Sequence, residues 1–183
     1  ASFLFSIKGH QSFTHERGDD WQEQAALFRD NVEPLVENNK IGIVLLQFPY
    51  SFHYTEENRT YLDRLCTCLA PLPVAVEFRN NEWQREEVYE GLRKREISFV
   101  VTDSPDLPKL PDPVSIATSE VGYIRFHGRN KKNWWQGDNT TRYDYLYSRE
   151  ELSEWLDQII TLLSKTRLLF IEQFSDAGVA PGA

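Results

Sequence analysis

Apolar residues along this chain form two alternating patterns, short continuous runs and longer segments at helical spacing. The clearest run is Ile41–Phe48, which reads Ile-Gly-Ile-Val-Leu-Leu-Gln-Phe and stops at Pro49. A run of this kind is typical of a strand that is buried on both faces of a parallel sheet. The segment Trp21–Asn38 carries its apolar residues at helical spacing instead, and Pro34 marks a point where that helix breaks or restarts.

The same patterns predict the remaining elements. Further strands are expected at Phe3–Lys8, Val74–Arg79, Ile97–Thr102, Val121–His127 and Leu168–Phe174. Helices are expected at Glu56–Leu69 with Thr55 as its cap, at Glu86–Arg95, and from a Ser148–Glu151 capping box to about Ser164. Regular alternation of strands and helices favours a parallel α/β fold, in one domain over residues 1–183. A closed barrel and an open doubly wound sheet both fit, although no glycine-rich phosphate loop follows any strand.

Composition narrows the class of protein. The 183 residues are enough for one hydrophobic core, and the aromatic content of 13% argues against disorder. No apolar run approaches the length of a membrane span, and we expect no signal peptide. The net charge of -8 disfavours non-specific binding to nucleic acid or to an anionic membrane. Cys66 and Cys68 point in different directions on a predicted helix, so we expect free thiols and a reducing, cytoplasmic location.

Polar side chains mark the end of nearly every predicted strand. In chain order they are Lys8, Gln47, Glu77 with Arg79, Asp103, and Arg125 with His127, and Glu172 or Gln173 is a further member. Because residues two apart share a face of a strand, we expect this set to point into a barrel lumen at its C-terminal mouth. Glu77, Asp103 and His127 are the candidates for general acid or base catalysis, and Arg79 should lower the pKa of Glu77. For each of these residues the alternative is a purely structural role, such as an ion pair inside the barrel.

A second cluster is the segment 125–147, here called the basic aromatic loop. It contains five basic residues, Arg125, Arg129, Lys131, Lys132 and Arg142, against the two acidic residues Asp138 and Asp144. Arginine offers paired donors for phosphate or carboxylate, and the Trp and Tyr residues of the loop offer faces for stacking. Long loops in compact domains tend to be functional. The alternative is a lid that folds onto the barrel, with its aromatic side chains as local core.

Several of these residues also occur in motifs of a known family. The motifs are Phe3-Leu4-Phe5-Ser6-Ile7-Lys8, Thr14-His15, Gln47-Phe48-Pro49, Glu77-Phe78-Arg79, Asp103-Ser104-Pro105, Tyr123-Ile124-Arg125-Phe126-His127-Gly128-Arg129-Asn130 with Trp134, and Arg142-Tyr143-Asp144-Tyr145. In order and spacing they resemble the YecE-like family, also called domain of unknown function 72. The resemblance implies a cytoplasmic protein of bacterial or archaeal origin with a TIM-like β/α barrel, of which about six of eight parallel strands are present. It supplies no reaction.

Two departures from the family pattern affect the expected barrel. The family's first two β/α units are absent, the chain contains no Met, and its first predicted element is already a strand. We therefore expect part of a longer protein, in which the barrel as given would have two open strand edges. The family also ends its last strand with Phe-Asn-Asn, where this chain has Phe174-Ser175-Asp176.

The favoured hypothesis is an enzyme, a hydrolase or isomerase, that acts on a small anionic molecule such as a phosphorylated compound. Arg79, Arg125 and Arg129 would clamp the anion, with Lys8 as a further positive charge. The full set of ligand-binding candidates is Lys8, His15, Gln47, Arg79, Arg125, Arg129, Asn130, Trp134, Arg142, Tyr143 and Tyr145.

Other hypotheses stay open. A divalent metal held by Glu77, Asp103 and His127 is less favoured, since no short-spaced ligand motif is present. A nucleic-acid or nucleotide-binding module would use the basic aromatic loop. A non-catalytic barrel would act through a partner protein. The sequence decides neither whether the chain is an enzyme nor its oligomeric state.

Overall fold

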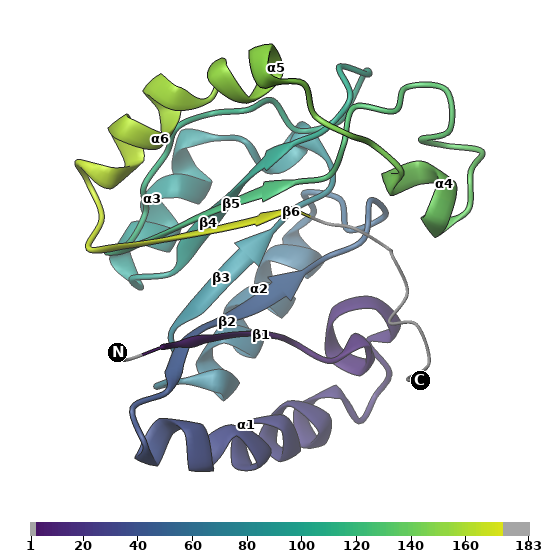
Figure 1. The fold of residues 1–183 in the computed structure, drawn as a ribbon. Helices are drawn as coiled ribbons and strands as arrows, with labels where there is room; N and C mark the ends of the chain where they lie inside the picture. Colours follow the sequence, from purple (N-terminus) through teal and green to yellow (C-terminus); the bar gives the residue numbers. More distant parts are fainter. Residues whose placement is uncertain (1–2, 174–183) are drawn as a thin grey trace, which may run out of the picture.

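Six parallel strands lie side by side in one curved sheet, with helices on its outer face (Figure 1). The computed structural model describes residues 3–173, without the side chains of residues 139 and 140. The strands are β1 Phe5–Lys8, β2 Ile41–Gln47, β3 Val74–Glu77, β4 Ser98–Asp103, β5 Val121–Phe126 and β6 Leu168–Gln173, and each pairs with the next in chain order. An open doubly wound sheet would reverse its strand order at a switch point. The sheet therefore has the strand order of an incomplete β/α barrel, as predicted.

The helices are α1 Trp21–Glu37, α2 Glu56–Leu69, α3 Glu86–Lys94, α4 Asn139–Tyr143, α5 Arg149–Ser153 and α6 Leu156–Leu163. A π-helical turn, Ser12–Glu16, follows β1, and a 3-10 turn, Asn81–Trp83, follows β3. The capping box of Ser148 and Glu151 is confirmed. The cap of α2 is confirmed as well, because the Thr55 hydroxyl accepts a hydrogen bond from the backbone N–H of Asn58.

Some helices differ from the prediction. Pro34 does not interrupt α1, which continues through it to Glu37. The single helix predicted from Ser148 divides into α5 and α6, and the Trp155 ring between them packs against Phe126 with centroids 5.0 Å apart. The basic aromatic loop contains the short helix α4, which no apolar periodicity marks in the sequence.

Alternation along the strands divides the buried residues into two cores. Ile43, Leu45, Val100 and Tyr123 belong to the inner core, which fills the barrel. Their sequence neighbours, such as Val44, pack outward beneath the helices. Burial on both faces explains why β2 reads as a continuous apolar run in the sequence.

An aromatic stack fixes the chain where β3 ends. Trp83 stacks on Phe78 and Phe52, with ring centroids 4.3 and 5.2 Å away, and its indole N–H donates to the Phe52 carbonyl at 2.7 Å. The amide of Asn80 donates to two carbonyls of the loop after β2, at 2.8 and 3.1 Å. These contacts hold the loops after β2 and β3 together, and they set the position of Arg79 between Phe78 and Asn80.

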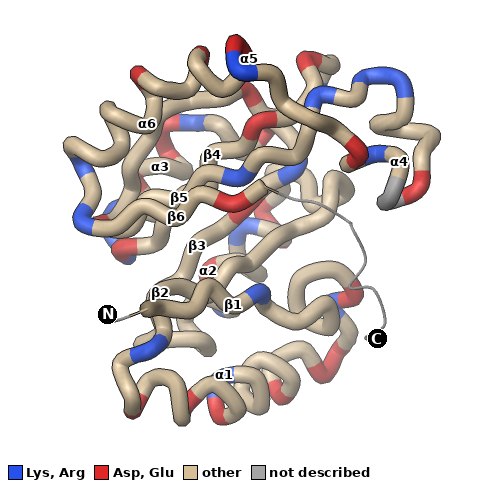
Figure 2. The backbone as a smooth tube through the Cα atoms, viewed as in Figure 1, with Lys and Arg blue, Asp and Glu red and all other residues tan. Residues whose placement is uncertain are grey.

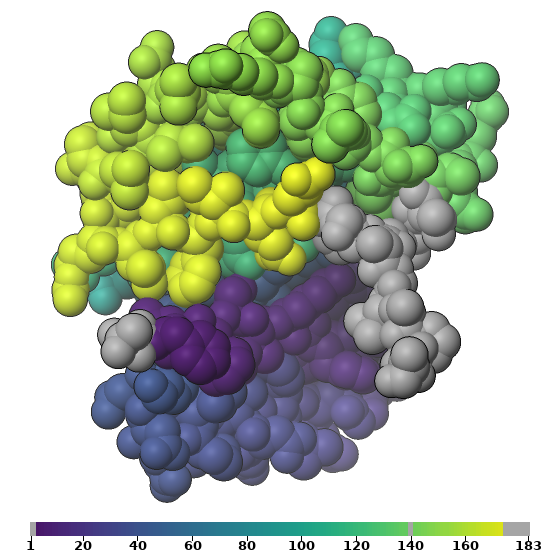
Figure 3. Space-filling view, in the orientation of Figure 1, coloured from purple at the N-terminus to yellow at the C-terminus, as the bar shows by residue number. Residues whose placement is uncertain are grey.

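The sheet is nearly closed. Within residues 3–173, β1 and β6 each pair with one neighbouring strand only. Figure 3 shows the residues of these two strands next to one another on one face of the molecule. The hydroxyls of Ser6 on β1 and Tyr123 on β5 lie 2.7 Å apart and link the two sides of the lumen. Residues 174–183, where the chain departs from the family's Phe-Asn-Asn ending, lie outside the described residues.

The structure also bears on two expectations drawn from the composition, which concern membrane-spanning helices and the two cysteines. None of the described helices is long and apolar enough to cross a membrane. Cys66 and Cys68 on α2 are both free thiols, which confirms that they do not pair. Burial raises the pKa of the Cys66 thiol to about 12, so this thiol is a part of the core and not a reactive group.

We expect the Thr55→Ala substitution to lower the free energy of unfolding by about 1 kcal/mol, because the first turn of α2 would lose its side-chain cap. Thr55→Ser keeps the acceptor oxygen and serves as the control. Urea denaturation at neutral pH measures both variants. An unchanged stability of Thr55→Ala would contradict the assigned role of the cap.

Candidate functional site

Charged residues lie along the chain where the parallel strands end (Figure 2). Lys8, Gln47, Glu77 and Asp103 are the last residues of β1, β2, β3 and β4. Because the strands run in the same direction, these ends form one edge of the sheet, which is the mouth of the barrel. The strand ends therefore meet on one side of the molecule, as the sequence predicted.

Glu77 is the centre of a buried ionic network beneath the mouth. Its side chain is 0% exposed, and its carboxylate contacts three basic side chains. Arg79 approaches with Nε at 2.6 Å, Arg125 with Nη1 at 2.5 Å and His127 with Nε2 at 3.1 Å. Arg125 also binds Glu172 on β6, with its Nε and Nη2 atoms 3.1 and 3.3 Å from the carboxylate oxygens. The network thus links β3, β5 and β6 across the lumen.

The network fixes the charge of its members. Burial by itself would raise the pKa of Glu77, but Arg79, His127 and Arg125 together hold that pKa well below its usual range. This confirms the direction predicted from the neighbouring arginine. Burial, together with the charge of Arg79, lowers the pKa of His127 to about 4, so the imidazole is neutral at pH 7. Nε2 of this neutral ring lies 3.1 Å from the Glu77 carboxylate.

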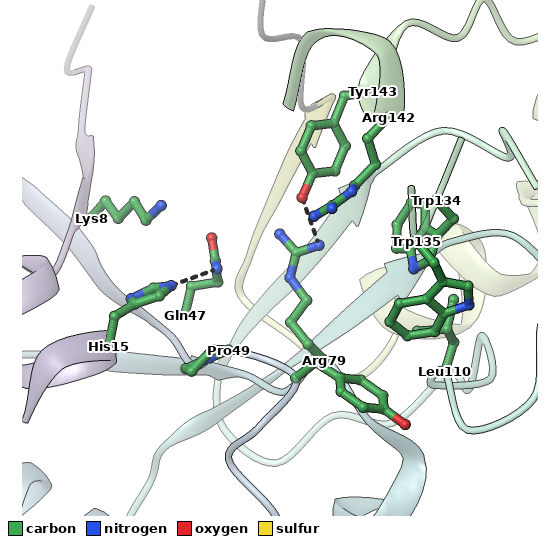
Figure 4. Close-up of a pocket in the computed structure, with 11 residues that line it drawn as sticks. Lys8, His15, Gln47, Pro49, Arg79, Leu110, Trp134, Trp135, Arg142 and Tyr143 are labelled. Atoms are coloured by element: carbon green, nitrogen blue, oxygen red, sulfur yellow. Dashed lines mark hydrogen bonds between the residues drawn. The ribbon is translucent and has the colours of Figure 1, made fainter. Parts of the chain in front are cut away.

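A cavity of about 520 Å3 opens at the barrel mouth and is called the mouth pocket here (Figure 4). Its wall consists of Lys8, His15, Gln47, Pro49, Tyr50, Arg79, Leu110, Trp134, Trp135, Arg142 and Tyr143. None of these described wall residues is acidic. Arg79 belongs to both the pocket and the network, because its Nε atom binds Glu77 and its Nη1 atom donates to the Tyr143 hydroxyl at 3.3 Å.

Lys8, His15 and Gln47 form one side of the mouth pocket (Figure 4). The Nε2 atoms of Gln47 and His15 lie 3.4 Å apart. Burial, and then the charges of Lys8 and Arg79, lower the pKa of His15, which keeps its ring neutral at pH 7. Burial, and then the charge of Arg125, lower the pKa of Lys8. No described residue forms an ion pair with Lys8, so its charge is available to a ligand.

The predicted inward position of Asp103 is wrong. Val100 of β4 faces the inner core, whereas Phe99 and Val101 face outward. Asp103 continues the outward series because side chains alternate along a strand. Its carboxylate accepts hydrogen bonds from Nε and Nη2 of Arg129, at 2.9 and 3.1 Å. The prediction failed because it placed Asp103 by its position at a strand end without following the alternation along β4.

Arg129 lies outside the mouth pocket as well, so it does not join Arg79 in a clamp. Besides Asp103 it binds Glu154, which follows α5, at 2.9 Å. We call the group of Asp103, Arg129 and Glu154 the clasp, since it ties the start of the basic aromatic loop to β4 and to the end of α5. Gly128 precedes the clasp with a φ of 82°, and a Cβ atom there would lie 2.6 Å from Cβ of Tyr145, so only glycine fits.

The other loop candidates separate into two groups. Trp134, Arg142 and Tyr143 line the mouth pocket. Asn130 and Tyr145 do not, because the Asn130 amide donates to a carbonyl of α4 at 3.0 Å and the Tyr145 hydroxyl binds a carboxylate of α5. The loop is therefore both a pocket wall and a locally packed lid.

The residues predicted as catalytic, Glu77, Asp103 and His127, do not line the mouth pocket. Glu77 and His127 lie beneath it, and Asp103 points away from the lumen, so the three do not form the metal site considered from the sequence. Across the described part of the chain, no group of three or more His, Cys, Asp or Glu side chains is placed to hold a metal ion. Glu77 meets the pocket wall through Arg79, and the His127 ring lies against the ring of the wall residue Tyr143, with centroids 6.0 Å apart.

Tyr50 and Trp135 belong to the pocket wall but were not among the ligand-binding candidates, although Trp135 lies in the basic aromatic loop. Their rings meet edge to face, with centroids 5.0 Å apart. Tyr50 lies in the loop only three residues beyond the end of β2. Its closeness to a strand end is the signal in the sequence that marks it. Trp134 and Trp135 are identical residues at consecutive positions, so the sequence does not show which of them faces a pocket. The path of the loop brings both into the wall.

We expect the imidazole of His127 to stay neutral down to about pH 4, because burial and the charge of Arg79 disfavour the protonated ring. The ring 15N chemical shifts, followed by NMR from neutral pH downward, report this titration. The His127→Gln variant assigns the signals. A titration midpoint near the ordinary value of 6.5 would contradict the buried network.

Glu77→Gln should lower the free energy of unfolding by about 3–5 kcal/mol at pH 7, since it leaves the partly buried Arg79 without its counter-charge and the buried Arg125 with Glu172 alone. The pKa of Glu77 is depressed in the folded protein, so its stabilising contribution is present above the unfolded value of 4.5 and is lost as the pH falls below that value. The difference between wild type and variant should therefore shrink below pH 4.5.

Urea denaturation over this pH range measures the effect of Glu77→Gln. Glu172→Gln is the matched control, because Glu172 contacts the same arginine but its side chain is 45% exposed. We expect a smaller loss for this control. Equal losses in the two variants, or a difference that is independent of pH, would argue against the central role of Glu77.

Known proteins with similar sequences and structures agree with this fold. The family model described as "Protein of unknown function DUF72" matches residues 1–181. The UPF0759 protein YunF of Bacillus subtilis is 30% identical over 190 residues, which cover 93% of this chain and 66% of YunF. The crystal structure of a DUF72 family protein from Thermotoga maritima has a TM-score of 0.87 and 38% identity, over 93% of this chain and 66% of that one. A DUF72 family structure from Enterococcus faecalis has a TM-score of 0.86 over 93% of this chain and 67% of that one, and at 24% identity it shows the likeness of fold alone.

The chain therefore spans about two thirds of the length of these bacterial relatives. None of their names states an activity. The family model nevertheless covers nearly the whole chain, and the likeness to the Thermotoga maritima structure covers 93% of it. This protein thus belongs to the DUF72 family of unknown function, and it has the parallel β/α-barrel architecture that its motifs implied.

Proposed function

We propose that this protein binds a small anionic molecule, such as a phosphorylated compound, in the mouth pocket. The observation that carries the proposal is the composition of the wall, where Lys8, Arg79 and Arg142 occur without any acidic residue among the described ones. Ammonium and guanidinium groups form strong, charge-assisted hydrogen bonds with phosphate and carboxylate. A wall of this kind would bind an anion and repel a cation.

The charge balance around the mouth supports the same proposal. The carboxylates of the network are Glu77 and Glu172, and the cationic side chains of the network and pocket are Lys8, Arg79, Arg125 and Arg142. Four positive charges against two negative ones leave an excess of two. In a cavity partly withdrawn from water, that excess attracts an anion more strongly than it would on an open surface.

If the bound anion reacts, we propose a hydrolysis or an isomerisation in which His15 accepts or donates the proton. Its neutral ring lies in the wall of the pocket, where a ligand can reach it. Glu77 and His127 are shielded beneath the pocket, so we assign them to the positioning of Arg79.

A nucleic-acid or nucleotide-binding module based on the basic aromatic loop is the second candidate. Its support is the number of basic and aromatic residues in the loop. However, Arg129 binds Asp103 and Glu154, and Lys131 lies 3.3 Å from Asp106. Because the protein's own carboxylates balance these charges, we favour a small anion in the pocket over a long polyanion on the loop.

Calorimetry with inorganic phosphate at low ionic strength and pH 7 tests the proposal. We expect Lys8→Gln and Arg142→Gln each to weaken binding by about tenfold, which corresponds to the loss of one charged hydrogen bond. Lys132→Gln is the matched control. Like Arg142→Gln it removes one positive charge from the basic aromatic loop, but Lys132 lies outside the pocket wall. Its affinity for phosphate should equal that of the wild type.

Equal weakening in all three variants would show a general effect of net charge and would contradict a site in the pocket. The absence of phosphate binding to the wild type would contradict the proposal directly. Retardation of single-stranded RNA or DNA that weakens steeply with salt, together with no binding of phosphate, would favour the second candidate.

A further inference from the structure

The two sides of the mouth pocket differ in chemistry (Figure 4). Lys8 and Gln47 lie on the side formed by β1 and β2. Trp134 and Trp135 lie together on the opposite side, and Arg79 lies between them. The pocket therefore offers Lys8 on one side, Arg79 and Arg142 towards the middle and the two indoles on the other side, and a ligand that fills it touches both charge and aromatic rings.

Trp135 is the ring that a ligand can contact. It is 51% exposed although it forms part of the pocket wall. Trp134 is 5% exposed and already packs edge to face on Tyr143, with centroids 6.0 Å apart. Tyr50 contacts Trp135 edge to face at 5.0 Å and so holds the indole in place. A half-exposed indole that is fixed by a second ring is an apolar surface for a flat group of the ligand to cover.

The polar groups of the wall argue against a sugar as the remaining part of the ligand. Each sugar hydroxyl donates one hydrogen bond besides those it accepts, and carboxylates are the strongest acceptors for it among side chains. The described wall has no carboxylate, and its charged groups, Lys8, Arg79 and Arg142, are all donors. An aromatic ring needs no such acceptors, so it matches this wall better than a chain of hydroxyl groups.

We infer that the ligand of the mouth pocket is an aromatic anion, with a phosphate or carboxylate group near Lys8, Arg79 and Arg142 and a planar ring on Trp135. This inference rests on the anion binding proposed above and adds the ring to it. The cavity of about 520 Å3 lies within the range of pockets that enclose small organic ligands, roughly 300–1,000 Å3.

Calorimetry with paired probes separates the ring from the charge. Inorganic phosphate and ribose 5-phosphate carry the anion without an aromatic ring, whereas phenyl phosphate carries both. We expect phenyl phosphate to bind about tenfold more tightly than inorganic phosphate, as one stacking contact provides, and ribose 5-phosphate to bind no more tightly than inorganic phosphate. Benzoate and acetate make the same comparison for carboxylates. Whichever of phenyl phosphate and benzoate binds more tightly shows whether the pocket prefers a phosphate or a carboxylate.

Two variants of Trp135 test where the ring binds. Trp135→Leu should reduce the preference for phenyl phosphate to about twofold or less, and it should leave the affinity for inorganic phosphate unchanged. Trp135→Phe keeps an aromatic ring and should keep most of the preference. Because Trp135 is half exposed, both variants should fold, which a thermal melt by circular dichroism checks. Arg142→Gln should weaken phosphate and phenyl phosphate alike.

The possible failures of the two proposals are distinguishable. If phosphate binds but the ring adds no affinity, if ribose 5-phosphate matches phenyl phosphate, or if the preference survives in Trp135→Leu, the inference is overturned and the proposed anion site stands. If no anion binds, or if Lys8→Gln and Arg142→Gln leave every affinity unchanged, the proposed function fails and the inference fails with it.

Discussion

The burial of one negative charge, that of Glu77, is the constraint on which the barrel mouth depends. An ionised carboxylate without partners is strongly disfavoured in an apolar interior, so the fold has to surround it with positive or hydrogen-bonding groups. Arg79, Arg125 and His127 meet this need from two strands and the segments that follow them. The neutralisation of one charge therefore also holds separate strand ends in register. The inner core below keeps water away, which strengthens these contacts.

The network of Glu77 also determines the position of one residue in the wall of the mouth pocket, Arg79. Glu77 holds the Nε side of the Arg79 guanidinium, and the Phe78–Trp83 stack fixes the backbone on either side of Arg79. The rest of the guanidinium extends into the mouth pocket, where it meets Tyr143 from the basic aromatic loop. Arg79 is thus the connection between a rigid interior and a wall that a loop completes. The buried carboxylate orients this one side chain, and the histidine also packs against the Tyr143 ring, with centroids 6.0 Å apart.

Periodicity in the sequence predicted the strands, most helices and the meeting of their ends, because these depend on which faces are buried. It predicted Lys8, Gln47 and Arg79 in the wall for the same reason. It could not predict pairing between residues far apart in the chain. Arg129 has the same chemistry as Arg79, but its partners are Asp103 and a residue after α5, so its charge is used inside the protein.

The loops are the other part of the structure that the sequence did not predict. The segment after β5 has no repeating apolar pattern, so neither α4 nor the approach of Trp135 to Tyr50 follows from it. The family motifs identified Trp134 and Tyr143, and the structure adds the neighbours that complete the wall. Parity along β4 would have placed Asp103 correctly, since a strand that is buried on both faces leaves its last residue on a definite side.

The clasp of Asp103, Arg129 and Glu154 has a consequence for how such a protein diversifies. It fastens the loop at its base to β4 and α5, away from the lumen. Exchanges at the tip, around Trp135, then leave the sheet and its ionic interior unaltered. An exchange at this position would therefore alter what the pocket accepts, while the barrel that carries the loop keeps its packing.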